Sequence, residues 1–287
     1  MNIDGSTTIV GIFGAPIKHT GSPAMHNAAF GAFEMNWAYL AFHVEPQNLR
    51  TALRGASDMG FVGINLTIPH KIMALDCIDD VDAEARKLGA VNTVSMEKGK
   101  LRGFNTDGYG FLKAIKEDFN LSIKGKRVLV LGAGGAGHGI AVKCALEGAA
   151  RVIVANRTPA RIEPIAREIR GTKTEFLALA LTAEEIRKVI HEVDLVVNAT
   201  SVGLQEGDSL GLGADLFSPH LHVYDTIYRP AETELLRVAE SAGAKVANGL
   251  SMLLHQGAKA FEIWTKRKAP LAVMRRALRA TIYGDKT

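Results

Sequence analysis

The sequence predicts an α/β fold with parallel strands, divided into two domains. Apolar runs of strand length alternate with helical patterns along nearly the whole chain, which is typical of βα units. The 287 residues are enough for two domains of ordinary size. With 47% hydrophobic and 22% charged residues, the composition is that of a globular protein.

The first third of the chain predicts a small α/β domain. Ser22 and Pro23 mark a helix start, with Ser22 as N-cap and Pro23 at the first helical position. A short helix follows Lys71, and a longer one starts near Gly108. Strands are expected at 8–13, 37–43 and 62–66, helices at 23–33 and 46–57, and a hairpin at 91–96 and 100–104.

A second βα unit begins near Lys124, with a strand at 128–131, a glycine loop, a helix and another strand. Further strands are expected at 195–198, 223–226 and 245–247. The last two helices, 251–265 and 271–282, have no sheet of their own, so we expect them to return to the first domain. The predicted domains are 1–107 with 249–287, and 108–248, separated by a cleft.

Composition and charge restrict the partners. The net charge of +4 is scattered, with no run of five basic residues, which argues against nucleic-acid binding and suits a small anionic ligand. No apolar run reaches the ~18–20 residues of a membrane span, and the N-terminus lacks the pattern of a signal peptide. Two cysteines favour a reducing compartment. We expect a soluble cytoplasmic protein, monomeric or homodimeric.

The segment 132–137 has the spacing G-x-G-x-x-G and lies between a strand and a helix, the context that this motif requires. Gly132 allows the tight turn, and Gly134 lets the backbone approach a pyrophosphate. The third glycine allows close packing of helix and strand. The alternative is a glycine-rich turn without a ligand. The segment therefore predicts a dinucleotide site that includes Gly132, Ala133, Gly134, Gly135 and Ala136.

The residues at the end of the next strand indicate which dinucleotide binds. Folds that bind NAD place Asp or Glu there, about 20 residues further on, for the ribose hydroxyl. Here the residues are Asn156, Arg157 and Thr158, with Arg161 one turn later. A carboxylate would repel a 2′-phosphate, whereas two arginines can pair with it. The alternative is two solvated arginines, but positive charge at a helix start opposes the helix dipole. We expect NADP as the cofactor.

Three polar residues in the first domain stand where the apolar pattern does not need them. Lys71 would lie at the positive end of a helix, an unfavourable place for a structural lysine. Asn92 interrupts an apolar run, and Asp107 stands between a strand and a helix. Each has a structural alternative, namely surface lysine, turn residue and N-cap. A desolvated lysine with a lowered pKa is a good proton-transfer group.

These segments also carry a family resemblance. The strings NLTIPHK, GAVNT, GFNTDG, LGAGGAG, ANRT, NATSVG, VYDTIYRPAETELL and GLSMLLHQGAKAFEIWT occur in the order and spacing of the shikimate dehydrogenase family. The resemblance spans essentially the whole chain. It implies an N-terminal α/β substrate domain and a Rossmann domain for NADP. It also implies the interconversion of 3-dehydroshikimate and shikimate by hydride transfer, in aromatic amino-acid biosynthesis.

The resemblance assigns roles to individual positions. Lys71 and Asp107 match the pair that handles the proton of the reacting hydroxyl. The expected substrate ligands are Thr20, Ser22, Thr67, Lys71, Asn92, Asp107, Tyr228 and Gln256. Further cofactor contacts are expected from Thr200, Val202, Ile227, Gly249 and Met252. The family's carboxylate-binding segment, H-S-L-S-P, reads here His19-Thr20-Gly21-Ser22-Pro23. Thr20 keeps the hydroxyl, but its methyl group narrows the space for the ring carboxylate. The segment therefore does not determine which ring is preferred.

Other chemistries find less support. None of the nine histidines has a zinc spacing, so no metal is expected. Two alternatives remain. One is a quinate/shikimate dehydrogenase, or a paralogue with a different ring or cofactor preference. The other is an NADP-binding regulator without catalysis, which the presence of both Lys71 and Asp107 opposes.

Overall fold

The computed structural model describes residues 3–18 and 20–284, and the chain divides into two compact units. Unit 1 comprises Met1–Gly110 and Leu254–Thr287, and unit 2 comprises Phe111–Leu253. The chain passes from one unit to the other within two helices, α5 (Asp107–Phe119) and α10 (Leu250–Thr265). No helix of the described residues is long and apolar enough to cross a membrane.

Unit 1 is built on a six-stranded sheet in the order β2-β1-β3-β5-β6-β4. Strand β1 pairs in parallel with β2 and β3, as βα connections require, while β5 runs antiparallel to both β3 and β6. The sheet is therefore mixed, with the predicted hairpin inserted beside the parallel strands. Its strands are β1 (Thr8–Gly14), β2 (Trp37–His43), β3 (Gly63–Leu66), β4 (Asp80–Val81), β5 (Thr93–Glu97) and β6 (Lys100–Phe104).

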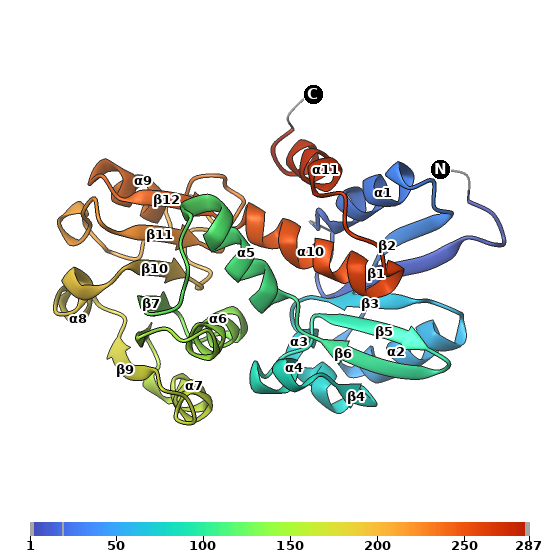
Figure 1. Cartoon of the computed structure of the whole chain (residues 1–287), viewed down its shortest axis with the longest axis horizontal. Coiled ribbons are helices and arrows are strands. Elements are labelled where there is room, and N and C mark those ends of the chain that lie inside the picture. The colour runs from blue at the N-terminus through green and yellow to red at the C-terminus, as the bar shows by residue number, and fades with distance from the viewer. Residues whose placement is uncertain (1–2, 19, 285–287) are drawn as a thin grey trace. The chain divides into compact units, whose positions relative to one another are not determined.

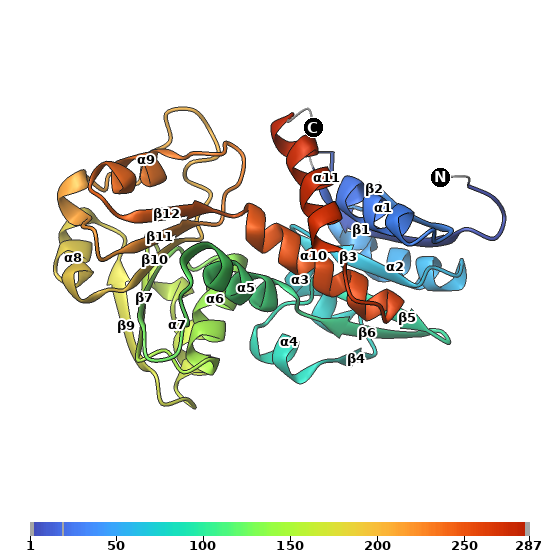
Figure 2. The same cartoon turned by 45° about the horizontal axis from the view of Figure 1, so that its top comes forward.

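Along the chain, the helices of unit 1 alternate with these strands, and α11 follows at the C-terminal end (Figure 1). The predicted helix at 46–57 consists of a 3-10 turn, Pro46–Asn48, followed by α2. Figure 2 shows α11 beside α1, and these two helices pack together. The helices are α1 (Ser22–Ala32), α2 (Leu49–Asp58), α3 (His70–Met73), α4 (Ala83–Lys87) and α11 (Leu271–Tyr283).

The predicted start of α1 is wrong by one residue. Gly21 is the N-cap and Ser22 the first helical residue, and no side chain caps the helix. The Ser22 hydroxyl instead hydrogen-bonds the hydroxyl of Tyr39, a fully buried residue of β2. A tertiary partner thus replaces the local bond that the sequence suggested.

The imidazole of His26 lies in the aromatic core of unit 1. It is fully buried and stacks on the Tyr39 ring with centroids 4.4 Å apart. Neither ring nitrogen has a hydrogen-bond partner among the described residues. Burial lowers the pKa of His26 from 6.5 to about 3, because the charged form would have to leave water without compensation.

We expect His26 to make the protein sensitive to acid. Below about pH 6.5 the unfolded chain protonates this histidine, whereas the folded chain stays neutral down to about pH 3. The unfolded state then binds more protons, so stability falls as pH falls, by about 2 kcal/mol at about pH 5. Urea unfolding of the wild type and His26→Phe at neutral pH and near pH 5 measures this loss. His43→Gln is the control, because His43 is half exposed. Equal pH dependence in wild type and His26→Phe would refute the assignment.

Unit 2 contains a second six-stranded sheet, in the order β12-β11-β10-β7-β8-β9, and all its strand pairs are parallel. Its central strands are buried on both faces, which explains the continuous apolar run at β7. The strands are β7 (Arg127–Leu131), β8 (Arg151–Asn156), β9 (Glu175–Ala180), β10 (Leu195–Asn198), β11 (His222–Asp225) and β12 (Lys245–Asn248).

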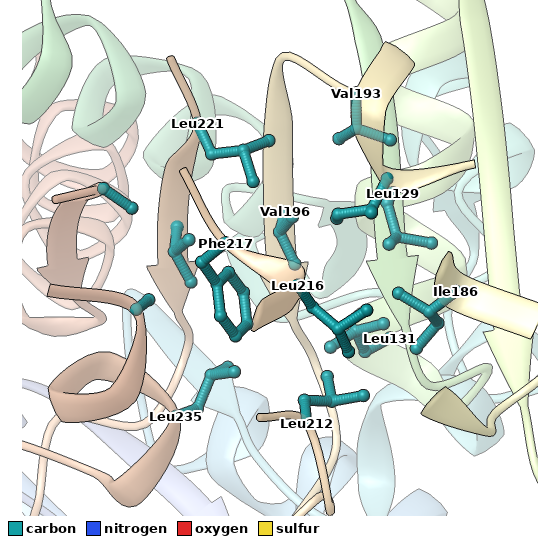
Figure 3. Packing of buried hydrophobic residues seen from close by; sticks show 14 of the residues in the cluster. Leu129, Leu131, Ile186, Val193, Val196, Leu212, Leu216, Phe217, Leu221 and Leu235 are labelled. Carbon is teal, nitrogen blue, oxygen red and sulfur yellow. The ribbon is translucent and has the colours of Figure 1, made fainter. Parts of the chain in front are cut away.

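One core of unit 2 lies on the sheet face that carries Leu129 and Val196, where Phe217 and Leu235 pack against the strands (Figure 3). The helices are α6 (Gly135–Leu146), α7 (Glu163–Ile169), α8 (Ala183–Arg187) and α9 (Glu234–Ser241). The order of the strands changes direction at β7, which has β8 on one side and β10 on the other. Open parallel sheets bind ligands at the carboxyl ends of the strands beside such a switch point.

Candidate functional site

Lys71 and Asp107 form an ion pair in unit 1, with Lys71 Nζ 2.7 Å from Asp107 Oδ2. Lys71 is the second residue of α3, and Asp107 is the first residue of α5. Their side chains are 32% and 25% exposed, so both are partly shielded yet open to a small molecule. The fold thus brings together two ionisable side chains that are 36 residues apart in the sequence.

Asn92 fixes the orientation of the Asp107 carboxylate. Its Nδ2 donates to Asp107 Oδ1 at 2.9 Å, which leaves Oδ2 for Lys71. Asn92 Oδ1 accepts from the Thr106 backbone at 2.7 Å, so the amide cannot turn over without losing both bonds. Asn92 Nδ2 also lies 3.3 Å from Gln256 Oε1 on α10. The structure therefore brings together four of the predicted substrate ligands, Lys71, Asn92, Asp107 and Gln256.

Thr67 lies between β3 and α3, and its backbone connects β1 to the start of α3, the helix that carries Lys71. Its amide donates to Phe13 and its carbonyl accepts from His70. A Cβ at Gly14 would lie 2.4 Å from the Thr67 methyl group, so glycine there makes room for the threonine. Tyr228, by contrast, belongs to unit 2 and follows β11.

The two predicted carboxylate ligands, Thr20 and Ser22, differ in how their hydroxyls are used. Thr20 Oγ1 accepts from the Ser22 amide at 3.3 Å, which leaves the Thr20 hydroxyl proton to be donated. The Tyr39 hydroxyl donates to Asn65 Oδ1 at 2.8 Å, so in its bond with Ser22 the serine is the donor. In this arrangement Thr20 presents a proton to an anion, whereas Ser22 must first turn away from Tyr39. His19, in the same segment, lies outside the described residues.

Packing explains the glycine at position 21. A Cβ there would lie 2.8 Å from Leu278 Cδ1 and 3.0 Å from Ile282 Cδ1, both on α11. A leucine at this position, as in the family's segment, would require the side-chain ends of Leu278 and Ile282 to move. The departure at Gly21 is thus matched to the C-terminal helix.

We expect Gly21→Leu to lower the free energy of unfolding by about 1–3 kcal/mol, because it overpacks the contact between α1 and α11. Combining it with Ile282→Ala should restore part of this loss by making room. Denaturant unfolding of both single variants and the double variant measures the coupling. Strictly additive effects would show that Gly21 and Ile282 do not share the space.

The glycine loop of unit 2 fits a dinucleotide. Gly132 has a φ of +101°, which favours glycine. A Cβ at Gly137 would lie 2.0 Å from the Gly132 carbonyl oxygen, so the third glycine allows the predicted close packing. A Cβ at Gly134 or Gly135 would meet no atom within 4 Å. Packing therefore does not require these two glycines, and they leave the backbone accessible at the start of α6. No side chain caps that helix, so its first amides can bind an anion.

The segment after β8 carries the predicted selectivity for the 2′-phosphate. Arg157 and Arg161 are exposed, and neither has a carboxylate partner among the described residues. Asn156 links this segment to the glycine loop, because it accepts from the Ala133 amide at 3.2 Å and donates to the Thr158 carbonyl at 2.8 Å. The two arginines are therefore held beside the glycine loop with their charge available to an anion.

The remaining predicted cofactor residues follow the other strands of the same sheet edge. Thr200 and Val202 follow β10, Ile227 follows β11, and Gly249 and Met252 follow β12. A Cβ at Gly249 would lie 2.1 Å from the Thr226 carbonyl oxygen, which shows how closely these loops pack. All the predicted cofactor residues thus lie in one unit, at the carboxyl ends of parallel strands.

Several buried polar residues contribute to these arrangements without having been predicted. Tyr39 and Asn65 connect Ser22 to the Asn92 segment, since Asn65 Nδ2 donates to the Asn92 carbonyl at 3.1 Å. Asn198 and Asp225 stand at the ends of β10 and β11 and are fully buried. For Asn65, Asn198 and Asp225 the sequence signal was present, because a polar residue inside or ending an apolar strand is costly unless it is paired. Within the described ranges no group of three or more His, Cys, Asp or Glu side chains could hold a metal.

Comparisons with known proteins agree over nearly the whole chain. Family models match the shikimate dehydrogenase substrate binding domain at residues 12–94, shikimate/quinate 5-dehydrogenase at 113–204, and the shikimate 5′-dehydrogenase C-terminal domain at 249–279. Shikimate dehydrogenase (NADP(+)) of Methanopyrus kandleri is 44% identical, over 97% of each chain.

Two solved structures are also similar. Shikimate 5-dehydrogenase from Listeria monocytogenes, in complex with shikimate and NAD, has a TM-score of 0.92 and 37% identity, covering 97% of this chain and 98% of the other. Shikimate 5-dehydrogenase from Thermus thermophilus, in complex with NADP(H) and shikimate, has a TM-score of 0.85 and 38% identity, covering 96% and 99%.

Proposed function

The chain belongs to the shikimate dehydrogenase family, and we propose that it interconverts 3-dehydroshikimate and shikimate with NADP as the hydride carrier. The observation that carries this proposal is the Lys71–Asp107 pair, at 2.7 Å, within a sequence that matches NADP-dependent shikimate dehydrogenases over nearly its full length. Both the reaction and the cofactor are those named for the relatives.

The Lys71–Asp107 pair handles the proton of the reacting hydroxyl. When shikimate is oxidised, this proton passes to the pair, and when the ketone is reduced, the Lys71 ammonium polarises the carbonyl and donates a proton. The 2.7 Å hydrogen bond between Lys71 Nζ and Asp107 Oδ2 places both groups where one reacting hydroxyl can contact them. Such a positioned acid–base group contributes ~10²–10⁴-fold to the rate.

The other predicted ligands of unit 1 orient the ring. Asn92 and Gln256 present amide groups beside Asp107, suited to hydrogen bonds with ring hydroxyls. The Thr20 hydroxyl proton is placed to be donated to the ring carboxylate, and Ser22 can add a second bond after turning from Tyr39. Holding the ring by both groups positions one hydroxyl for reaction, which is a large part of such catalysis.

Unit 2 would hold NADP, which supplies the hydride acceptor when bound. The uncapped start of α6 and the open glycines 134 and 135 suit the pyrophosphate, and Arg157 and Arg161 suit the 2′-phosphate. We propose that unit 1 binds the substrate and unit 2 binds NADP.

The proposal extends to the cellular setting. Cys77 and Cys144 are both buried and unpaired, which suits a reducing compartment such as the cytoplasm. A monomer or a homodimer would serve the reaction equally, because each chain carries both predicted sites.

Product identification tests the proposed reaction. Purified protein incubated with shikimate and NADP⁺ should form NADPH and 3-dehydroshikimate in equal amounts, as measured by absorbance and chromatography. Formation of product with quinate but not with shikimate would identify the alternative of a quinate dehydrogenase. No NADPH formation with either ring would contradict the proposed function.

A further inference from the structure

We infer that Asn198 and Asp225 are positioning residues which fix, as one buried pair, the loops that receive the nicotinamide half of NADP. The inference rests on the proposed function, because it assigns a task to the loops that carry Thr200, Val202 and Ile227. Neither residue is among the predicted cofactor contacts. Both act through hydrogen bonds to the residues that are.

The pair lies across two adjacent strands. Asn198 ends β10, Asp225 ends β11, and the two residues are direct partners in the parallel register. Asn198 Nδ2 lies 3.1 Å from both carboxylate oxygens of Asp225, and both side chains are fully buried. Burial raises the pKa of Asp225, whereas its hydrogen bonds lower it. Burying a carboxylate costs free energy unless hydrogen bonds replace those it made with water.

The bonds of Asn198 hold the loop after β10. Its Oδ1 accepts from both the amide and the hydroxyl of Thr200, at 3.0 and 2.7 Å. Its Nδ2 donates to the Val202 carbonyl at 3.1 Å. Two of the predicted cofactor residues are therefore tied to one buried carboxamide.

The bonds of Asp225 hold the loop after β11. Its Oδ1 accepts from the Ile227 amide at 3.0 Å, and its Oδ2 accepts from the Thr233 hydroxyl at 2.7 Å. The Ile227 carbonyl in turn accepts from the Gly249 amide at 3.1 Å, which extends the chain of bonds to the segment after β12. A Cβ at Gly203 would lie 3.1 Å from Thr233 and 3.3 Å from Ile227, so the two loops also pack directly on each other.

The order of the strands indicates which half of NADP these loops receive. Arg157 and Arg161 follow β8, on one side of the glycine loop, whereas β10 and β11 lie on the other side. A dinucleotide whose 2′-phosphate is at β8 and whose pyrophosphate is at the start of α6 extends its nicotinamide half over β10 and β11. The Asn198–Asp225 pair thus acts on the loops after β10 and β11, whereas the arginines for the 2′-phosphate lie on the β8 side of the glycine loop.

The test compares NADPH with 2′,5′-ADP, a fragment that has the adenosine half alone, by isothermal titration. Asp225→Asn keeps the shape but puts a donor where an acceptor is needed. We expect it to weaken NADPH binding about tenfold and to leave 2′,5′-ADP binding within about twofold of wild type. Asp194→Asn is the matched control, since Asp194 precedes β10 at the opposite edge of the sheet and accepts from the Arg127 amide at 2.8 Å. It should change neither affinity.

Thr233→Val keeps the carboxylate and removes the hydroxyl that donates to Asp225 and caps α9. It should give the same selective loss to a smaller degree and serves if Asp225→Asn does not fold. The inference is overturned if the folded variants bind NADPH as tightly as wild type, or if they lose both ligands equally. Wild-type protein that binds neither ligand would instead count against the proposed function itself.

Discussion

Replacing Lys71 by alanine should lower kcat by about 10²–10⁴-fold, because it removes the only ammonium that bonds the Asp107 carboxylate in the described part of the chain. The Asp107 carboxylate would remain, held by Asn92, but it would lose the Lys71 ammonium that donates a hydrogen bond to it. Steady-state kinetics in both directions, with folding checked by circular dichroism, measures the loss.

The affinity for NADP is the internal control for Lys71→Ala. Lys71 lies in unit 1, whereas every predicted contact to NADP lies in unit 2, so NADP binding should stay nearly unchanged. Lys113→Ala provides a matched control, since it removes a lysine outside the predicted site. Turnover that survives in Lys71→Ala would show that another group handles the proton.

Neutralising Arg157 and Arg161 together should shift the cofactor preference from NADP toward NAD by about 10²-fold, measured as the ratio of the two kcat/KM values. Each guanidinium offers charge-assisted bonds to the 2′-phosphate, worth about 1.5–3 kcal/mol in a favourable setting and less at an exposed one. The affected quantity is mainly kcat/KM with NADP, because NAD has no phosphate at this position.

Arg167→Ala is the matched control for the two arginines. Arg167 lies on α7 and pairs with Glu163, so its loss should leave the preference unchanged. A double variant Arg157→Ala/Arg161→Ala that still prefers NADP as strongly as wild type would assign the selectivity to other residues.

The strands and the glycine loop could be predicted because local patterns determine them. The strands at 37–43 and 195–198 have the predicted bounds, and the third glycine packs as its motif requires. Short elements with weak patterns were missed, such as β4, which has only two residues, and β9, whose side chains are half exposed. A two-residue strand has no pattern to recognise, and the apolar run of β9, at 176–180, cannot be told from a buried helical segment by periodicity alone.

The site was predicted less completely than the fold, since its missing parts are tertiary. Lys71 and Asp107 could be identified as residues that the apolar pattern did not need, and they form a pair. The partner of Ser22 is Tyr39, an aromatic residue of a strand that reads as ordinary core. The fit of Gly21 to α11 depends on Leu278 and Ile282, near the other end of the chain, which no local pattern could reveal.

The measurement that tests the account most directly crosses shikimate and quinate with NADP⁺ and NAD⁺ and compares the four values of kcat/KM. The account predicts that shikimate with NADP⁺ gives the highest value. The match to NADP-dependent shikimate dehydrogenases supports this substrate. Arg157 and Arg161 replace the acidic residue that would favour NAD. A higher value with quinate, or with NAD⁺, would contradict the proposed substrate or cofactor respectively.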